Sequence, residues 1–192
     1  MHNDETGVSP MTWGQIARRI RVPLGFVSAA AYLWLARPNW PAIAAGSVIV
    51  IFGLSLRAMA SGHVRKNEAL ATSGPYAHTR NPLYLGSILM ACGFAVAARS
   101  WSVGALFVAL LLVIYMPVIR SEEEFLRCKF PEFEDYARSV PRLLPRIAPP
   151  PGVDGGVSFS KELYWQHREY NALLGALAMM AAVAAKLIYF KG

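Results

Sequence analysis

The sequence predicts an all-α membrane protein with five transmembrane helices. Composition is the first observation, because 55% of the residues are hydrophobic and only 16% are charged, whereas a soluble domain carries about 25% charged residues. The second observation is that the apolar residues are gathered into five long runs. The third is an uneven distribution of Lys and Arg between the segments that join these runs. A length of 192 residues suits one domain, and we expect residues 1–192 to form a single integral membrane domain.

The five apolar runs have lengths close to those of spanning helices, which need about 17–25 residues. We expect the spans at about residues 22–36, 42–60, 83–98, 101–119 and 172–190. Trp40 and Trp101 stand near the ends of runs, where an aromatic belt would meet the membrane surface. Arg57 and Lys186 fall inside runs, and we expect their long side chains to extend to the membrane surface.

Most positive charges fall on one side of these expected spans. That side receives Arg18, Arg19, Arg21, Arg57, Arg65, Lys66, Arg80, Arg120, Arg127, Lys129, Arg138, Arg142, Arg146, Lys161 and Arg168. The other side receives Arg37, Arg99, Lys186 and Lys191. Because cytoplasmic loops carry the excess of Lys and Arg, we expect a cytoplasmic N-terminus in the plasma (inner) membrane of a bacterium. The polar segments 61–82 and 120–171 then both lie in the cytoplasm.

The net charge of +7 would suit nucleic acid or an anionic membrane surface. The charges stand between apolar runs and do not form one basic face, so we expect a membrane partner and no nucleic acid. Cys92 lies in an apolar run and Cys128 in a polar segment, and their opposite environments predict no disulfide. The spacing of Cys and His residues predicts no metal site.

The first polar segment ends in GPYAHTRNPLYLG, from Gly74 to Gly86. Asn81 is a good N-cap and Pro82 suits the first position of a helix, so we expect the third span to begin there. The free backbone N–H groups of such a helix end form a site for an anion. His78 and Arg80 add donors beside it. The alternative is a helix cap flanked by the positive charge that cytoplasmic loops usually carry.

The second polar segment begins RSEEEFLRCKF at Arg120. The fourth span is expected to continue into an amphipathic extension that Pro131 interrupts, and its apolar face should rest on the membrane or pack on the loop before the third span. The face consists of Leu126, Phe130, Phe133, Ala137 and Val140. The acidic run Glu122–Glu124 offers two interpretations. Glu123 could pair with Arg127 four residues later, or the carboxylates could hold a cationic ligand beside an anionic leaflet.

Together the two segments resemble a family. GPYAHTRNPLYLG is similar to a signature of the isoprenylcysteine carboxyl methyltransferases and the related membrane phospholipid methyltransferases. The glutamate run, followed by VPRLLP at Val140–Pro145, is similar to the family's second signature. The resemblance covers about Ser61–Pro145, with one helical hairpin between the blocks. This sequence has Asn81 where the family usually has histidine, so no imidazole can titrate at that position.

The resemblance implies a methyltransferase that binds S-adenosylmethionine beneath the cytoplasmic face of the membrane. Positions matching those that wrap or line the donor are Leu70, Ala71, Tyr76, Asn81, Pro82, Leu83 and Tyr84. Glu122 and Glu123 match the acidic position that holds the donor's ammonium. Arg80 and the helix N-terminus complement its carboxylate. Arg120 lies near a position that contacts the acceptor.

The acceptor is expected to be a membrane lipid, or a prenylated or other apolar molecule, that enters between the helices. A carboxylate or thiolate acceptor needs no base, whereas an amine must lose a proton to His78 or a glutamate. The resemblance favours a carboxyl O-methyltransferase acting on a prenylated cysteine. Phospholipid N-methylation and S-methylation of a small thiol are alternatives within the superfamily.

Two functions of other classes also fit a small helical membrane protein. A sterol-type reductase would bind NADPH, but such enzymes usually have more spans, and the sequence shows no further basic pocket for a 2′-phosphate. A scaffold or transporter is the other, and a transporter would place more polar residues within its spans. The alanine-rich fifth run suits close helix packing, within a monomer or in a homodimer.

Overall fold

The computed structural model describes residues 13–65, 68–150 and 158–189, with side chains in the first helix described from Pro23 onward. All regular elements in these ranges are helical. The expected all-α fold is therefore confirmed. The expected cytoplasmic N-terminus concerns residues outside the described ranges.

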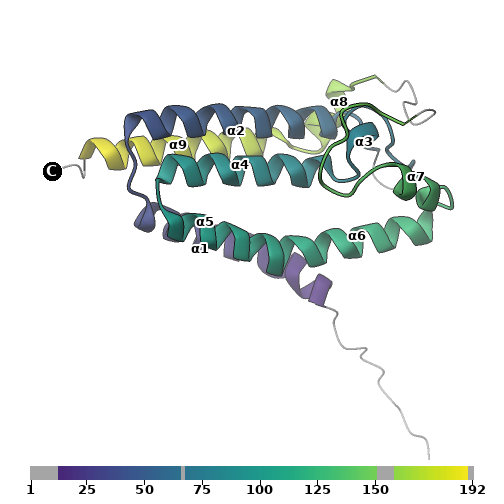
Figure 1. Cartoon of the computed structure of the whole chain (residues 1–192), viewed down its shortest axis with the longest axis horizontal. Coiled ribbons are helices and arrows are strands. Elements are labelled where there is room, and N and C mark those ends of the chain that lie inside the picture. Colours follow the sequence, from purple (N-terminus) through teal and green to yellow (C-terminus); the bar gives the residue numbers. More distant parts are fainter. Residues whose placement is uncertain (1–12, 66–67, 151–157, 190–192) are drawn as a thin grey trace, which may run out of the picture.

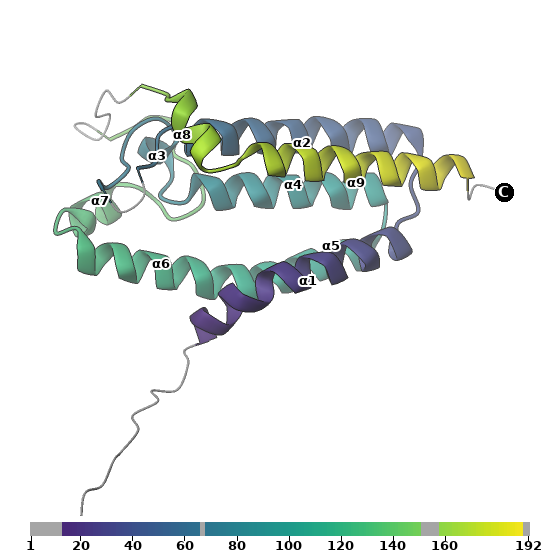
Figure 2. The same ribbon diagram turned by 180° about the vertical axis from the view of Figure 1, so that it is seen from behind.

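Five long helical stretches form the body of the molecule. They are α1 (Trp13–Leu35), α2 (Trp40–Ser61), α4 (Pro82–Ala98), the continuous stretch of α5 (Trp101–Leu110), η1 (Leu111–Tyr115) and α6 (Met116–Lys129), and α9 (Tyr170–Tyr189). The short helices are α3 (Pro75–His78), α7 (Phe133–Ser139) and α8 (Lys161–Gln166). Figures 1 and 2 show that the short helices and long loops gather at one end of the body, while short connections join the helices at the other. The two polar segments singled out in the sequence therefore meet at the same end.

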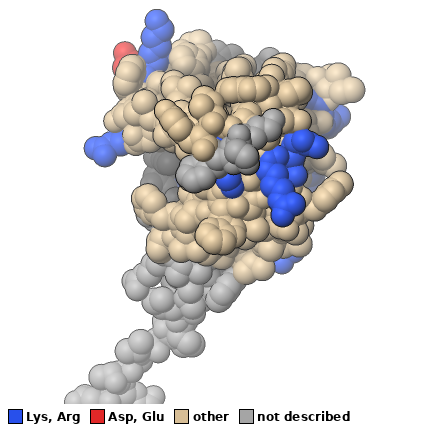
Figure 3. Space-filling view, turned by 90° about the vertical axis from the view of Figure 1, so that its left-hand side faces the viewer, with Lys and Arg blue, Asp and Glu red and all other residues tan. Residues whose placement is uncertain are grey.

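Within the part of the chain that the structure describes, three helical stretches are long and apolar enough to cross a membrane: Trp40–Ser61, Trp101–Lys129 and Tyr170–Tyr189. Two further apolar helices, Pro23–Leu35 and Pro82–Ala98, are shorter. All five predicted runs are therefore helical, and the chain is an integral membrane protein. Passage of all five through the bilayer stays a prediction. Figure 3 shows the end with the short connections, where Lys and Arg side chains stand apart among residues of other kinds.

Glycines allow α2 and α4 to pack closely along their length. Gly46 and Gly53 of α2 face Gly93 and Gly86 of α4. A Cβ atom on Gly93 would come within 2.6 Å of the Gly46 carbonyl oxygen, and one on Gly53 would be equally close to the carbonyl of Gly86. Side chains at these positions would force the helices apart, so the glycines set the distance between α2 and α4.

Two cations expected to extend to the membrane surface have hydrogen-bond partners on other parts of the chain. Lys186 of α9 donates hydrogen bonds to the carbonyl oxygens of Leu33, Trp34 and Ala36 at 2.6, 3.1 and 2.8 Å. It thereby satisfies carbonyl groups at the end of α1, where a positive charge is favourable. Arg57 turns into the bundle and contacts α4 and Glu169.

A π-helical turn interrupts the long stretch between α5 and α6. The N–H of Met116 donates to the carbonyl of Leu111, five residues earlier. Pro117 follows at once, and proline has no N–H and clashes with the carbonyl four residues before it. Widening of the helix by one residue accommodates that clash. The widened turn carries Ile114 and Tyr115 on a buried face of the bundle.

Candidate functional site

The two signature segments are joined by hydrogen bonds at the end of the body that carries α3, α7 and α8, which we call the functional end. The backbone N–H of Arg80 donates to the carbonyl of Pro141, and that of Arg146 donates to the carbonyl of His78, both at 2.9 Å. The buried Thr79 hydroxyl donates to the carbonyls of Arg142 and Leu143. These bonds hold the start of α4 against the segment after α7, so residues about 60 positions apart form one site.

Asn81 occupies the N-cap of α4, and the helix begins at Pro82 as expected. Its side chain, however, makes no capping hydrogen bond. The amide Nδ2 donates instead to Oε1 of Glu123 at 3.0 Å and to the carbonyl of Arg142 at 3.1 Å. The expected side-chain cap is therefore wrong. The amide serves as a link between α4, α6 and the segment after α7.

Glu123 is the centre of a buried polar cluster. It is only 3% exposed, and a carboxylate can stay charged at such a position only when it is paired. Its Oε2 accepts hydrogen bonds from Nε and Nη2 of Arg142 at 2.9 and 2.7 Å. Asn81 binds the other oxygen. The expected pairing of Glu123 with Arg127 is therefore wrong, and Arg127 pairs with Glu134.

Arg80 lies beside this cluster with unused donor capacity. Its Nε is 3.6 Å from Oε1 of Glu123, too far for a hydrogen bond. That nitrogen is buried and has no hydrogen-bond partner within the described part of the chain. The guanidinium stands 6.0 Å from the ring centre of Phe133. Because an unpaired buried donor is costly, the position suits an anionic ligand group.

A cavity of about 360 Å³ opens beside these residues. All ten residues predicted to bind the donor line it: Leu70, Ala71, Tyr76, Arg80, Asn81, Pro82, Leu83, Tyr84, Glu122 and Glu123. Sequence reasoning assigned no binding role to its other lining residues, which are Val64, Arg65, Ala69, Phe125, Leu126, Phe130, Phe133 and Tyr136. The sequence indicates Leu126, Phe130 and Phe133 only as members of an amphipathic face. We call this space the polar-end cavity.

The amphipathic face of the second segment packs on the loop before α4, as one of the two alternatives held. Phe133, Tyr136 and Val140 form a buried cluster with Leu70 of that loop packed against it. The hydroxyl of Tyr136 donates to the carbonyl of Tyr76 at 2.7 Å. The face therefore forms a wall of the cavity and joins the two segments.

The acidic and phenolic groups of the cavity differ in whether they can offer a negative charge to a ligand. Glu122 is half-buried, and its carboxylate makes no hydrogen bond or ion pair with the described residues. Burial raises the pKa of Tyr76 above its ordinary value, and the nearby Tyr136 and Glu122 raise it further. Burial likewise raises the pKa of Tyr136. Both phenols therefore stay neutral near neutral pH, which leaves Glu122 as the available anion.

Two residues expected to act on the acceptor lie outside the lining of the polar-end cavity. His78 is turned toward the segment after α7, where its Nδ1 pairs with the carbonyl of Arg146 at 2.8 Å. A carbonyl only accepts, so this ring nitrogen carries the proton. Arg120 is exposed on α6. Neither residue reaches the polar-end cavity in this structure.

A profile of the phospholipid methyltransferase family matches residues 29–132, which is more than half of the chain. The chain belongs to this family. The match runs from within α1 to just beyond the end of α6, and it contains all of segment 61–82 and the glutamate run Glu122–Glu124 of the second segment. The resemblance read from the two signatures is therefore confirmed.

The chain is similar to curated proteins whose names differ from one another. The chain is 42% identical over 84 residues to the cobalt-zinc-cadmium resistance protein CzcN of Cupriavidus metallidurans, covering 44% of this chain and 39% of that protein. It is 28% identical over 125 residues to the protein-S-isoprenylcysteine O-methyltransferase of Schizosaccharomyces pombe, covering 65% of this chain and 48% of that protein. The chain thus spans less than half the length of these relatives. No solved structure matches it.

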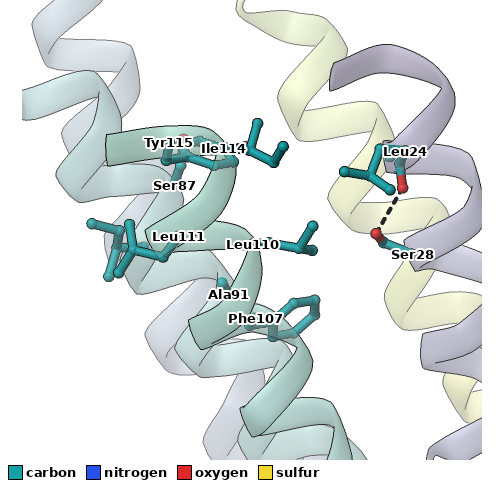
Figure 4. Close-up of a pocket in the computed structure, with 11 residues that line it drawn as sticks. Leu24, Ser28, Ser87, Ala91, Phe107, Leu110, Leu111, Ile114 and Tyr115 are labelled. Atoms are coloured by element: carbon teal, nitrogen blue, oxygen red, sulfur yellow. Dashed lines mark hydrogen bonds between the residues drawn. The ribbon is translucent and has the colours of Figure 1, made fainter. Parts of the chain in front are cut away.

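This chain has a second cavity, of about 200 Å³, within the helical body. Figure 4 shows side chains from α1, α4 and the α5–η1 stretch converging on it. The hydroxyls of its two serines are used internally, because Ser28 donates to the carbonyl of Leu24 and Ser87 to that of Leu83. The surface offered to a ligand is therefore mainly hydrocarbon. We call this space the apolar cavity.

An aromatic pair stands between the two cavities. Tyr84 lines the polar-end cavity and Tyr115 lines the apolar cavity. Their rings meet edge to face, with centres 5.8 Å apart, an arrangement that aromatic pairs favour. The π-helical turn supplies Tyr115, so the local widening of that helix contributes to the boundary between the cavities.

Proposed function

We propose that this chain is an S-adenosylmethionine-dependent methyltransferase that binds its donor in the polar-end cavity. One observation carries the proposal: the cavity presents a buried arginine nitrogen without a hydrogen-bond partner and a carboxylate without an ion pair among the described residues. The donor carries a carboxylate, an ammonium and a sulfonium. Arg80 suits the carboxylate, because a guanidinium binds that group with strong charge-assisted hydrogen bonds. Glu122 suits the ammonium, and its negative charge also favours the sulfonium.

The remaining residues would hold and orient the donor. Glu123 is already bound by Asn81 and Arg142, so we assign it a positioning role and leave the ammonium to Glu122. The aromatic wall formed by Phe130, Phe133 and Tyr136 supplies a surface for the adenosine part and excludes water. The donor, when bound, supplies an electrophilic methyl group. What this chain contributes is alignment of the reacting atoms and a site from which water is excluded.

The acceptor is proposed to be a lipid or prenylated molecule whose apolar chain lies in the apolar cavity. That cavity is lined mostly by hydrocarbon and adjoins the donor site through Tyr84 and Tyr115. Among the described residues that line the polar-end cavity there is no histidine, and Tyr76 and Tyr136 hold their protons near neutral pH. An acceptor that needs no general base, such as a carboxylate or thiolate, therefore suits this site better than an amine.

The proposed arrangement places both cavities relative to a bilayer. We propose that all five apolar helices cross it and that the end carrying α3 and α7 faces the cytoplasm. The excess of Lys and Arg in segments 61–82 and 120–171 supports this orientation. The donor would then enter from the cytoplasm and the acceptor from the membrane.

Equilibrium binding in detergent tests the proposal. The full chain should bind S-adenosylhomocysteine and should not bind NADPH, as measured by titration calorimetry. Methyl transfer should then be measured from labelled S-adenosylmethionine to N-acetyl-S-farnesylcysteine, with unprenylated N-acetylcysteine as the matched probe. Transfer to the farnesylated probe alone would support the apolar acceptor site. Binding of NADPH in place of S-adenosylhomocysteine would overturn the proposal.

A further inference from the structure

Arg57 of α2 joins three parts of the chain through its guanidinium. Its Nε and Nη2 donate to the two carboxylate oxygens of Glu169 at 3.0 and 2.8 Å. Its Nη1 donates to the carbonyl of Leu83 at 3.2 Å and to the hydroxyl of Ser87 at 2.6 Å. The side chains of Arg57 and Glu169 are 21% and 11% exposed. This is a mostly buried, two-pronged ion pair with its third arm on α4.

The two α4 groups held by Arg57 belong to different cavities. Leu83 lines the polar-end cavity, and Ser87, one turn later, lines the apolar cavity. Gly86 lies between them, and a Cβ atom there would come within 2.6 Å of the Arg57 side chain. The arginine thus lies against the turn of α4 at which the helix passes from one cavity to the other.

Glu169 comes from a part of the chain outside the family match. That match ends at residue 132, and Glu169 directly precedes α9. Its charge and that of Arg57 both act on the pKa of Tyr76, a lining residue of the polar-end cavity, with opposite signs. The C-terminal helix is therefore connected, through one ion pair, to residues of both cavities.

We infer that Arg57 and Glu169 are positioning residues that set the first two turns of α4 between the donor and acceptor cavities. The inference rests on the proposed function for the roles of those cavities. Glu169 acts through Arg57. An arginine within an apolar helix needs a partner, and without the carboxylate its side chain would be drawn to the membrane surface and away from α4. The planar guanidinium is required because lysine cannot bind a carboxylate in two places and reach α4 at the same time.

A purely structural ion pair is the competing explanation, and two measurements separate it from positioning. The first is hydrogen–deuterium exchange of the α4 amides from Leu85 to Ser87 in the protein without added ligand. The second is affinity for S-adenosylhomocysteine in detergent. The variants are Glu169→Gln and Arg57→Lys. Asp135→Asn is the matched control, because Asp135 pairs with Arg138 on the exposed surface of α7, away from α4.

Both variants should speed exchange at Leu85–Ser87 and leave exchange at the far end of α4 near Ala97 unchanged. Both should weaken S-adenosylhomocysteine binding by about tenfold, within the range of coupling between residues in direct contact. Glu169→Gln combined with Ser87→Ala should lose little more affinity than Glu169→Gln alone, because loss of the Glu169 carboxylate already draws Nη1 of Arg57 away from Ser87. Asp135→Asn should leave both measurements unchanged.

The two proposals fail in different ways. Unchanged exchange at Leu85–Ser87 in both variants would overturn the positioning role, whatever the ligand affinity. A uniform rise in exchange along all helices would also overturn it, because that is the effect of a general loss of stability. A wild-type protein that fails to bind S-adenosylhomocysteine, with the local change in exchange still present, would overturn the proposed function and leave the connection between α9 and α4 standing.

Discussion

Asn81 donates a hydrogen bond to Glu123 across 42 positions of sequence, at a distance of 3.0 Å. The bond joins the first residue before α4 to the middle of α6. Arg142 holds the other oxygen of the same carboxylate, so three segments are fixed at one buried group. Glu122, the preceding residue, keeps its carboxylate directed to the polar-end cavity. The two neighbouring glutamates therefore lie in different surroundings, one bound within the protein and one facing the cavity.

Asn81→Asp tests the link between α4 and α6. Asp can serve as an N-cap about as well as Asn, so a capping role alone would predict little change in stability. The structure predicts a loss of about 1–3 kcal/mol, because the amide donor is removed and a second carboxylate faces Glu123. Thermal unfolding in detergent measures the effect. Asn81→His, which keeps an N–H donor, is the control and should retain more stability, whereas an equally stable Asp variant would contradict the link.

Glu122→Gln and Glu123→Gln should have opposite profiles. Glu122→Gln should weaken S-adenosylhomocysteine binding by about 2 kcal/mol or more, as for a partly desolvated charged contact, with little change in unfolding temperature. Glu123→Gln should lower stability by about 1–3 kcal/mol, because the charge-assisted hydrogen bonds from Arg142 would weaken, while solvent reaches the Arg142 side chain, which is 39% exposed. Calorimetric titration and thermal unfolding of both variants provide the comparison. Affinity that is insensitive to Glu122→Gln would remove the ammonium site from this residue.

The general fold and the cavity could be predicted from sequence because their signals are local. Apolar runs mark helices by length, and a turn dipeptide such as Asn81-Pro82 marks a helix start. The residues that the two signatures single out line one cavity because each motif positions its own neighbours. Pro117 was the available signal for the π-helical turn, although proline alone does not distinguish that turn from a simple kink.

Side-chain partners could not be predicted in the same way. Local rules assigned Asn81 to a cap and Arg57 to the membrane surface, yet their partners lie 42 and 112 positions away. A buried charge pairs with whichever opposite charge the tertiary fold brings near it. Spacing along the sequence does not predict which charge that is. His78 shows the same limit, because the loop geometry turns it toward Arg146.

Gly93→Ala should separate α2 from α4. The added Cβ atom would meet the carbonyl of Gly46 at 2.6 Å, and backbone cannot move aside cheaply. Overpacking of this kind costs about 1–3 kcal/mol. Gly104→Ala is the matched control, since nothing lies within 4 Å of its Cβ position, and there alanine should stabilise the helix by about 1 kcal/mol. Unfolding temperatures in detergent should move in opposite directions, and a parallel shift would contradict the tight contact.

Alkaline pH should destabilise the polar-end cavity before it affects the helical body. Burial raises the pKa of Tyr76 and Tyr136 in the folded state, whereas an unfolded tyrosine titrates at about 10. The stability that these phenols contribute is therefore fully present below about pH 10 and falls as pH rises above it. Unfolding followed from pH 8 to 11 should show this decline. Tyr136→Phe removes one titrating group and should make the decline shallower; an unchanged slope would exclude Tyr136 as a source.

Labelling of single cysteines tests the five-span orientation. In a chain with Cys92→Ser, the native Cys128 is exposed and lies in the last turn of α6, between Phe125 and Phe130, which line the polar-end cavity. A membrane-impermeant maleimide should label it in inverted membrane vesicles and leave it unlabelled in intact cells.

Ser102→Cys in a chain lacking both native cysteines should show the reverse pattern, because the exposed Ser102 lies in the first turn of α5 at the opposite end. Five crossings require the two cysteines to lie on opposite sides of the membrane, because α5, η1 and α6 form one continuous stretch between them. Ser158→Cys, which precedes α8, should label from the same side as Cys128, since the backbone N–H of Ser160 donates to the carbonyl of Gly62 at the functional end. Labelling of Cys128 from outside intact cells would place the proposed donor site away from the cytoplasmic supply of S-adenosylmethionine, and the orientation given by the Lys and Arg residues would be wrong.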